Sequence, residues 1–149
     1  MTRPDSMAMI RSESRMTSGM SCSMSSKVMP TKPINTGGAI KRALSQVLAE
    51  WQPQLILNGD TWYEPNVLQL KSFAQAKHRP VCLSVKPIPV NDRYGSVLLE
   101  ANGDINGFRS EPNDNANINA GCYFIEPIAL SAVLNSYPET FSFEADCLP

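Results

Sequence analysis

Apolar runs typical of strands alternate with segments of helical period, and this alternation constrains the fold more than any other feature of the chain. The three- and four-residue apolar spacing of the helical segments predicts helices that bury one face. The wholly apolar run Leu55-Ile56-Leu57 is typical of a strand buried on both faces. The predicted helices lie at 37–48, 65–77 and 127–134, and the predicted strands at 55–57, 81–85 and 118–125. This order predicts an α/β sheet covered by helices.

Turn and cap signals refine the pattern. Asn102-Gly103 lies between strand-like segments at 94–100 and 105–108, and Asn-Gly is a strong signal for a β-hairpin turn. Thr36 is placed to cap the first helix and Ser142 to cap a final one, because a hydroxyl accepts a hydrogen bond from an unpaired N–H of the first turn. We therefore expect a β-hairpin inserted in the α/β sheet.

Composition excludes several classes of protein. The 149 residues suffice for one domain with a core. The net charge of -1 provides no basic excess to attract a polyanion, so we expect no nucleic-acid partner. No apolar run approaches the ~20 residues of a membrane helix. Four cysteines without a Cys-x-x-Cys pair and the single histidine, His78, do not have the spacing of a zinc site. We expect a cytoplasmic protein with reduced, buried cysteines, and we make no prediction of its oligomeric state.

Residues 1–30 differ from the rest of the chain. All seven methionines lie at or before Met29, eight serines accompany them, and the segment has no helical or strand period. We therefore separate a disordered or non-homologous segment, 1–30, from a domain at 31–149. Its origin has three interpretations: a disordered tail, a targeting peptide, or sequence from a shifted reading frame or misplaced start. The third is slightly favoured, because the segment lies where sequence of the domain is expected.

Two short motifs are suited to bind a nucleotide. In Thr36-Gly37-Gly38-Ala39, two glycines open a helix whose first N–H groups are unpaired donors at a positive dipole end. Asn58-Gly59-Asp60 ends an apolar strand, at the edge where open α/β sheets bind ligands, and a carboxylate there suits Mg²⁺. Either motif alone is also compatible with an ordinary turn. We expect both to face one cleft.

The order of the motifs is more specific than any one of them. The series runs Pro-x-x-Thr-Gly-Gly-Ala-Ile, Leu-Asn-Gly-Asp, Arg-Tyr-Gly, Ile-x-x-Phe, Ile-Asn-Ala-Gly-x-Tyr and Phe-Ser-Phe-Glu-x-Asp-x-Leu-Pro. In these motifs the chain resembles the sugar-phosphate nucleotidyltransferases, most of all the branch of heptose 1-phosphate and mannose-1-phosphate guanylyltransferases. The resemblance covers Lys32 to Pro149.

The resemblance implies a Rossmann-like, GT-A-like α/β three-layer sandwich, here incomplete and with a β-hairpin insertion. It also implies a reaction in which a sugar 1-phosphate attacks the α-phosphorus of an NTP, with GTP the expected nucleotide and Mg²⁺ the expected cofactor, and pyrophosphate leaves. By motif it places the nucleotide at Thr36, Gly37, Gly38, Ala39, Asn58 and Gly59, the metal at Asp60, and the sugar phosphate at Gly95, Asn119 and Glu144. It assigns no catalytic residue.

The chain departs from this family in three respects. The family's Gly-Gly-x-Gly-Thr-Arg-Leu signature has no match before Thr31, and its Asp-Ile-Gly segment, which carries a second metal ligand, has no match before Pro149. The family's Phe-x-Glu-Lys is replaced by Phe108-Arg109-Ser110-Glu111, which removes a cation. We expect a domain truncated at both ends with little turnover alone, because each lost group stabilises transition-state charge. The alternatives are a non-catalytic module that binds a sugar nucleotide or a partner, and a non-functional fragment.

Overall fold

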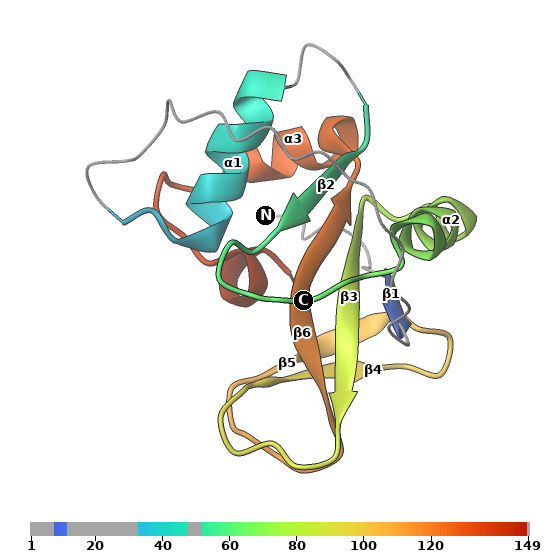
Figure 1. Ribbon diagram of the computed structural model, residues 1–149. Coiled ribbons are helices and arrows are strands. Elements are labelled where there is room, and N and C mark those ends of the chain that lie inside the picture. The colour runs from blue at the N-terminus through green and yellow to red at the C-terminus, as the bar shows by residue number, and fades with distance from the viewer. Residues whose placement is uncertain (1–7, 12–32, 48–51, 149) are drawn as a thin grey trace.

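Helices and strands alternate in the structure as the apolar pattern predicts (Figure 1). The computed structural model describes residues 8–11, 33–47 and 52–148. The elements are β1 (Ala8–Arg11), α1 (Asn35–Val47), β2 (Gln54–Leu57), α2 (Val67–Lys77), β3 (Val81–Ile88), β4 (Ser96–Leu99), β5 (Ile105–Arg109), β6 (Ala116–Ile125), α3 (Pro127–Asn135) and the π-helical turn η2 (Phe143–Cys147).

Four strands form the main sheet, in the order β1-β3-β6-β2. β1 is parallel to β3, and β6 is antiparallel to both β3 and β2. β4 and β5 pair separately as an antiparallel hairpin, which confirms the hairpin predicted at Asn102-Gly103. Figure 1 shows this hairpin toward one end of the long strands β3 and β6, away from α1 and α3. The hairpin packs against β6 and so adds a wall beside the sheet.

Helices cover both faces of the main sheet. Successive side chains of a strand point to opposite faces, and in β3 Leu83 belongs to the core with Leu44 of α1 and Leu130 of α3. Its neighbour Cys82 belongs to a second core with Leu70 of α2. Figure 1 shows α1 and α3 together, with α2 apart from them beside β3. The arrangement confirms a three-layer α/β sandwich.

The strand β2 is less buried than its apolar run predicts. Leu55 and Ile56 are half-buried, and Leu57 is 53% exposed, so the prediction of burial on both faces is wrong. β2 is the last strand of the sheet in the described part of the chain, with β6 as its neighbour. Periodicity cannot separate an edge strand from a central one when the run is only a few residues long.

One predicted helix cap is wrong and the other is confirmed. α1 begins at Asn35, and the Thr36 hydroxyl accepts a hydrogen bond from the N–H of Phe143, 3.1 Å away, in place of an N–H of its own helix. The Ser142 hydroxyl accepts a hydrogen bond from the N–H of Ala145 at 3.1 Å and caps η2. Thr36 therefore connects two distant segments, which a local capping rule does not anticipate.

The segment 1–30 contributes one described element. Ala8–Arg11 form β1, which pairs in parallel with Cys82–Val85 of β3, so the expectation of disorder is corrected for these four residues. The rest of the segment lies outside the described residues. A strand of four residues is too short to show a period, and here its pairing with β3 defines it.

Candidate functional site

A cavity of about 630 Å³ lies between the hairpin, β6 and η2. Three parts of the chain line it: residues 94–97 and 107–110 at the hairpin, residues 118–119 of β6, and Glu144, Ala145 and Leu148 in and just after η2. The three residues predicted to bind a sugar phosphate lie one in each part, Gly95, Asn119 and Glu144. The structure thus brings together in one cavity three residues that the motifs only place in order along the chain.

The hairpin side of the cavity depends on close backbone packing at Gly95. A Cβ atom at Gly95 would lie 2.6 Å from the carbonyl oxygen of Arg109. The buried side chain of Asn91 holds the preceding residue in place: its amide donates to the Tyr94 carbonyl at 2.6 Å, and its oxygen accepts from the Tyr94 N–H at 2.9 Å. Sequence reasoning missed Asn91, because an asparagine in a turn is too common to indicate a role.

Glu144 is the most densely hydrogen-bonded group of the cavity. Its Oε2 accepts from the Thr36 hydroxyl at 2.9 Å and from the Ser142 hydroxyl at 3.4 Å. Its Oε1 accepts from the Tyr123 hydroxyl and, at 3.5 Å, from the Asn119 amide. A carboxylate has about four acceptor positions, so Glu144 is held from both oxygens. Thr36, which we predict to bind the nucleotide, therefore contacts Glu144, which we predict to bind the sugar phosphate.

A bulge in β6 extends this network to the end of β2. The register of β3 with β6 shifts between Leu83 and Val85, and Gly121 has a φ of 70°. The Gly121 N–H donates to the Asn119 side chain at 2.8 Å, and its carbonyl accepts from the Asn58 N–H at 2.8 Å. Thr36, Glu144, Asn119 and Asn58 are thus linked through hydrogen bonds, although they come from four separate segments.

The two glycines of the predicted nucleotide loop have a structural role. A Cβ atom at Gly37 would lie 2.3 Å from the Phe141 ring, and one at Gly38 would lie 2.1 Å from the Glu139 carbonyl oxygen. The Gly37 N–H donates to the Phe141 carbonyl at 3.0 Å. The close approach that these glycines allow is that of the chain's own segment 139–141, by the Phe141 ring at Gly37 and by the Glu139 backbone at Gly38, which corrects our reason for expecting a ligand there. Both glycines are buried, and the next residue, Ala39, is exposed.

Asp60, the predicted metal ligand, is an exposed carboxylate. Its Oδ1 accepts a hydrogen bond from the Thr61 hydroxyl at 3.3 Å. Among the described residues, no group of three or more His, Cys, Asp or Glu side chains could hold a metal ion. No hydrogen bond or ion pair of the described residues joins Asp60 to residues 36–39, so a shared cleft stays a prediction. A Cβ atom at Gly59 would meet nothing within 4 Å, so this position is open.

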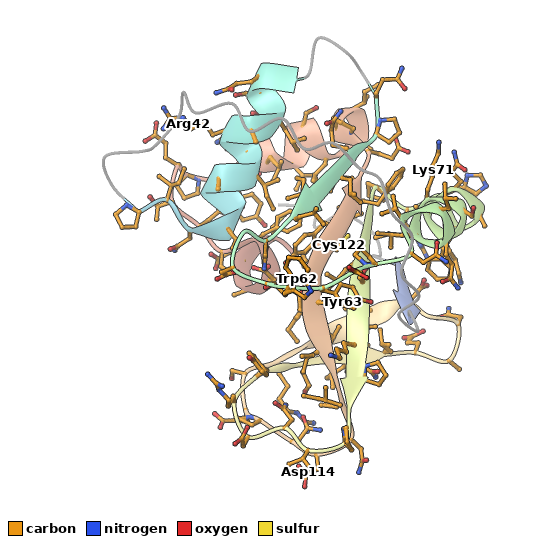
Figure 2. All side chains as sticks on the ribbon, viewed as in Figure 1. Arg42, Trp62, Tyr63, Lys71, Asp114 and Cys122 are labelled. Carbon is orange, nitrogen blue, oxygen red and sulfur yellow. The ribbon has the colours of Figure 1, made fainter. Side chains whose placement is uncertain are left out.

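A smaller cavity, of about 230 Å³, lies where the segment after β2 crosses β6. Figure 2 shows Trp62 and Tyr63 on this segment, near Cys122. All three line the cavity together with Asn58, and Trp62 is 94% exposed. Sequence reasoning did not single out these aromatic residues, although they directly follow Asn58-Gly59-Asp60.

Comparison with known proteins identifies the family of the domain. The family described as nucleotidyl transferase matches residues 2–149, so the match extends across the boundary placed at residue 31. D-glycero-alpha-D-manno-heptose 1-phosphate guanylyltransferase of Aneurinibacillus thermoaerophilus is 33% identical over 123 residues, which are 78% of this chain and 49% of the relative. The mannose-1-phosphate guanylyltransferase catalytic subunit beta of Drosophila melanogaster is 29% identical over 105 residues, 69% of this chain and 28% of the relative.

A solved structure leads to the same family. HddC from Yersinia pseudotuberculosis, complexed with GMP-PN, has a TM-score of 0.65 and 28% identity, and the similarity covers 82% of this chain and 52% of that one. The chain therefore spans about half the length of both the heptose guanylyltransferase and HddC. The family matches residues 2–149, and 78% of this chain aligns with the heptose enzyme at 33% identity. This chain therefore belongs to the nucleotidyl transferase family.

Proposed function

We propose that the chain forms the sugar-1-phosphate side of a nucleotidyltransferase site. The observation that carries this proposal is the convergence of Gly95, Asn119 and Glu144, from three segments, on one cavity. Its volume of about 630 Å³ lies within the ~300–1,000 Å³ usual for small-molecule sites. The heptose and mannose relatives are named for sugar 1-phosphate substrates, which supports this class of ligand.

The residues that line the cavity suit such a ligand. Glu144 and Asn119 offer a carboxylate and an amide for sugar hydroxyls, while Val97 and Leu148 supply apolar surface. Arg109 is the basic residue that lines the cavity in the described part of the chain, and its guanidinium makes no hydrogen bond or ion pair there. A guanidinium binds phosphate well, so Arg109 would supply the charge that the replaced family lysine does not.

In the proposed reaction, an oxygen of the sugar phosphate forms a bond to the α-phosphorus of the NTP. The bond from that phosphorus to the bridging oxygen breaks, and pyrophosphate leaves with the electron pair. The protein's part is to position the two phosphates in line and to balance their charge. GTP is the expected nucleotide, because the relatives are named guanylyltransferases and HddC is complexed with GMP-PN.

Mg²⁺ is the expected cofactor of this reaction, and it would offset negative charge on the transferred phosphate. Asp60 would contribute one carboxylate. A single exposed carboxylate does not hold Mg²⁺ by itself, so phosphate oxygens and water would have to supply the remaining ligands. The residues present therefore fit a metal that is shared with the nucleotide and do not form a metal site of their own.

The isolated carboxylate of Asp60 favours a second candidate function. A module that binds a sugar phosphate or sugar nucleotide without turnover needs the cavity but not a complete metal site. Among the described residues, Asp60 is not accompanied by further carboxylates in a metal-binding group. Slow pyrophosphate release that is lost in Asp60→Ala would indicate the transferase, and no release would indicate the binding module, whereas ligand binding is expected for both.

We also infer a cytoplasmic location. The cysteines that the structure describes, Cys82, Cys122 and Cys147, are free and buried, as is usual in a reducing compartment. In the described part of the chain, no helix has the length and apolar character needed to cross a membrane.

Binding of α-D-mannose 1-phosphate to the full chain tests the proposal. Calorimetric titration should give saturable binding that is tighter than that of mannose or inorganic phosphate alone. Glu144→Gln should weaken it by roughly tenfold or more, since a hydrogen bond to a charged group contributes ~1.5–3 kcal/mol. Pyrophosphate release with GTP, measured in parallel, should be far below the ~10 s⁻¹ median of enzymes.

Glu100→Gln is the matched control, because Glu100 is exposed and lies outside the cavity lining. It should bind mannose 1-phosphate as the unsubstituted chain does. A folded chain that does not bind mannose 1-phosphate, or a Glu144→Gln variant that binds it equally well, would show that the site is misassigned.

A further inference from the structure

The hydroxyl of Tyr123 is a buried polar group. Tyr123 ends the motif Ile-Asn-Ala-Gly-x-Tyr, and the sequence assigns it no role. Tyr123 is 1% exposed, and its ring packs in the main core, edge-on to Phe143 with ring centroids 5.7 Å apart. A buried hydroxyl destabilises a core unless it is hydrogen-bonded. A phenylalanine would fill the same space without that cost, so the partners of the hydroxyl indicate what it does.

Those partners are two of the polar side chains that line the large cavity, Asn119 and Glu144. The Tyr123 oxygen accepts a hydrogen bond from the Asn119 amide at 2.7 Å, and its O–H donates to Oε1 of Glu144. The Asn119 oxygen is in turn held by the Gly121 N–H at 2.8 Å, which fixes the orientation of the amide. One hydroxyl therefore orients both a carboxylate and an amide of the cavity.

The other partners of Glu144 are weaker anchors. Thr36 is exposed, and Ser142 lies at 3.4 Å, near the limit of a hydrogen bond. Water or a ligand hydroxyl can replace such contacts, whereas the Tyr123 hydroxyl is shielded from water. Burial, and then the negative charge of Glu144, raise the pKa of Tyr123 well above its ordinary value. The hydroxyl therefore stays protonated and remains a donor to Glu144 at any physiological pH.

We propose that Tyr123 is a positioning residue, which fixes Glu144 through Oε1 and Asn119 through its amide so that both bind hydroxyls of the sugar 1-phosphate. The inference rests on the proposed function of the cavity. Oε2 of Glu144, with its exposed and long contacts, is then the oxygen that exchanges a protein partner for a sugar hydroxyl. Tyr123 itself does not touch the ligand.

Tyr123→Phe tests this, because it removes the hydroxyl and keeps the ring. The dissociation constant for α-D-mannose 1-phosphate should rise about tenfold, as expected when one charge-assisted hydrogen bond no longer preorganises a site. Tyr63→Phe is the matched control, because the Tyr63 hydroxyl has no hydrogen-bond partner in the described part of the chain. That variant should bind mannose 1-phosphate as the unsubstituted chain does.

A double-mutant cycle separates positioning from packing. If Tyr123 acts through Glu144, then Tyr123→Phe should weaken binding little further in a Glu144→Gln background. If the two substitutions raise the dissociation constant by factors that multiply fully, Tyr123 contributes only packing, and the inference is overturned. An unchanged dissociation constant for Tyr123→Phe, when Glu144→Gln does weaken binding, would also overturn it and leave the proposed function intact. No effect of Glu144→Gln would instead reject the proposed function.

A measurement on the unsubstituted chain keeps the test decisive if Tyr123→Phe does not fold. The hydroxyl proton of Tyr123 should exchange slowly enough to be seen by NMR and should shift when mannose 1-phosphate binds. A proton that is visible but does not move at saturating ligand would contradict the inference.

Discussion

Gly38 lies where α1 passes the backbone at Glu139, and its single hydrogen in place of a side chain lets the two segments touch. Gly37 does the same beside the Phe141 ring. These residues therefore hold α1 against the segment that leads into η2, and Thr36 next to them holds η2 directly. These residues therefore shape the cavity by letting α1 pack against that segment.

Gly38→Ala should lower the free energy of unfolding by about 1–3 kcal/mol, in the range of overpacked sites. The new Cβ would lie 2.1 Å from the Glu139 carbonyl oxygen, which is backbone and cannot rotate away. The close contact itself costs more than this net loss, because alanine also gains ~1 kcal/mol over glycine inside a helix. Urea unfolding of the two chains measures the difference.

Gly59→Ala is the matched comparison, since its Cβ would meet no atom within 4 Å. Its stability should stay within about 0.5 kcal/mol of the unsubstituted chain. Equal stabilities for Gly38→Ala and Gly59→Ala would mean that the close packing at Glu139 is absent.

At the scale of elements, an ion pair joins the end of α2 to the turn of the hairpin. Arg79 donates to Oδ2 of Asp104 at 3.0 Å, and Lys77 lies 4.0 Å from Oδ1. The pair is partly buried, with 28% exposure for Arg79 and 15% for Asp104. It links two elements that the sequence predicts independently, and it helps to set where the hairpin lies relative to the sheet.

Arg79→Met should destabilise the chain by about 1–2 kcal/mol, because it leaves a partly buried carboxylate with a single distant cation. Hydrogen exchange should quicken first at the amides of the hairpin, 96–109. The control is Arg42→Met, because the exposed guanidinium of Arg42 makes no hydrogen bond or ion pair in the described part of the chain. If both variants are equally stable, the pair does not hold the hairpin.

At the scale of the whole molecule, buried thiols occur in both cores. Burial raises the pKa of Cys82 to about 12 from its ordinary 9.0, and it raises the pKa values of Cys122 and Cys147 to about 11. The folded chain thus keeps thiol protons at a pH at which the unfolded chain has released them. By linkage, rising pH then favours the unfolded chain.

The free energy of unfolding should therefore fall as the pH rises from 9 to about 11, whereas the thiol contribution is fully present below pH 9. Urea unfolding at pH 8, 9, 10 and 11 measures this change. The fall should be smaller in Cys122→Ala, which removes one of the titrating thiols. A stability that rises over this range would contradict the assignment of these thiols to the cores.

Much of the fold could be predicted from the chain alone, because period, turn chemistry and caps depend on adjacent residues. The alternation of elements, the hairpin at Asn102-Gly103 and the cap at Ser142 are of this kind. The order of the motifs indicated the family, and it named Gly95, Asn119 and Glu144 before any geometry was known.

Only the tertiary structure decided what depends on contacts between distant residues. The exposure of β2 follows from its place in the sheet, and the tight fit at Gly38 depends on a backbone about a hundred residues further along the chain. The partners of Tyr123 likewise cannot be inferred from its neighbours in sequence. Hydrogen bonds and close packing act over a few ångströms in space, so residues far apart in the chain reveal them only when the fold brings them together.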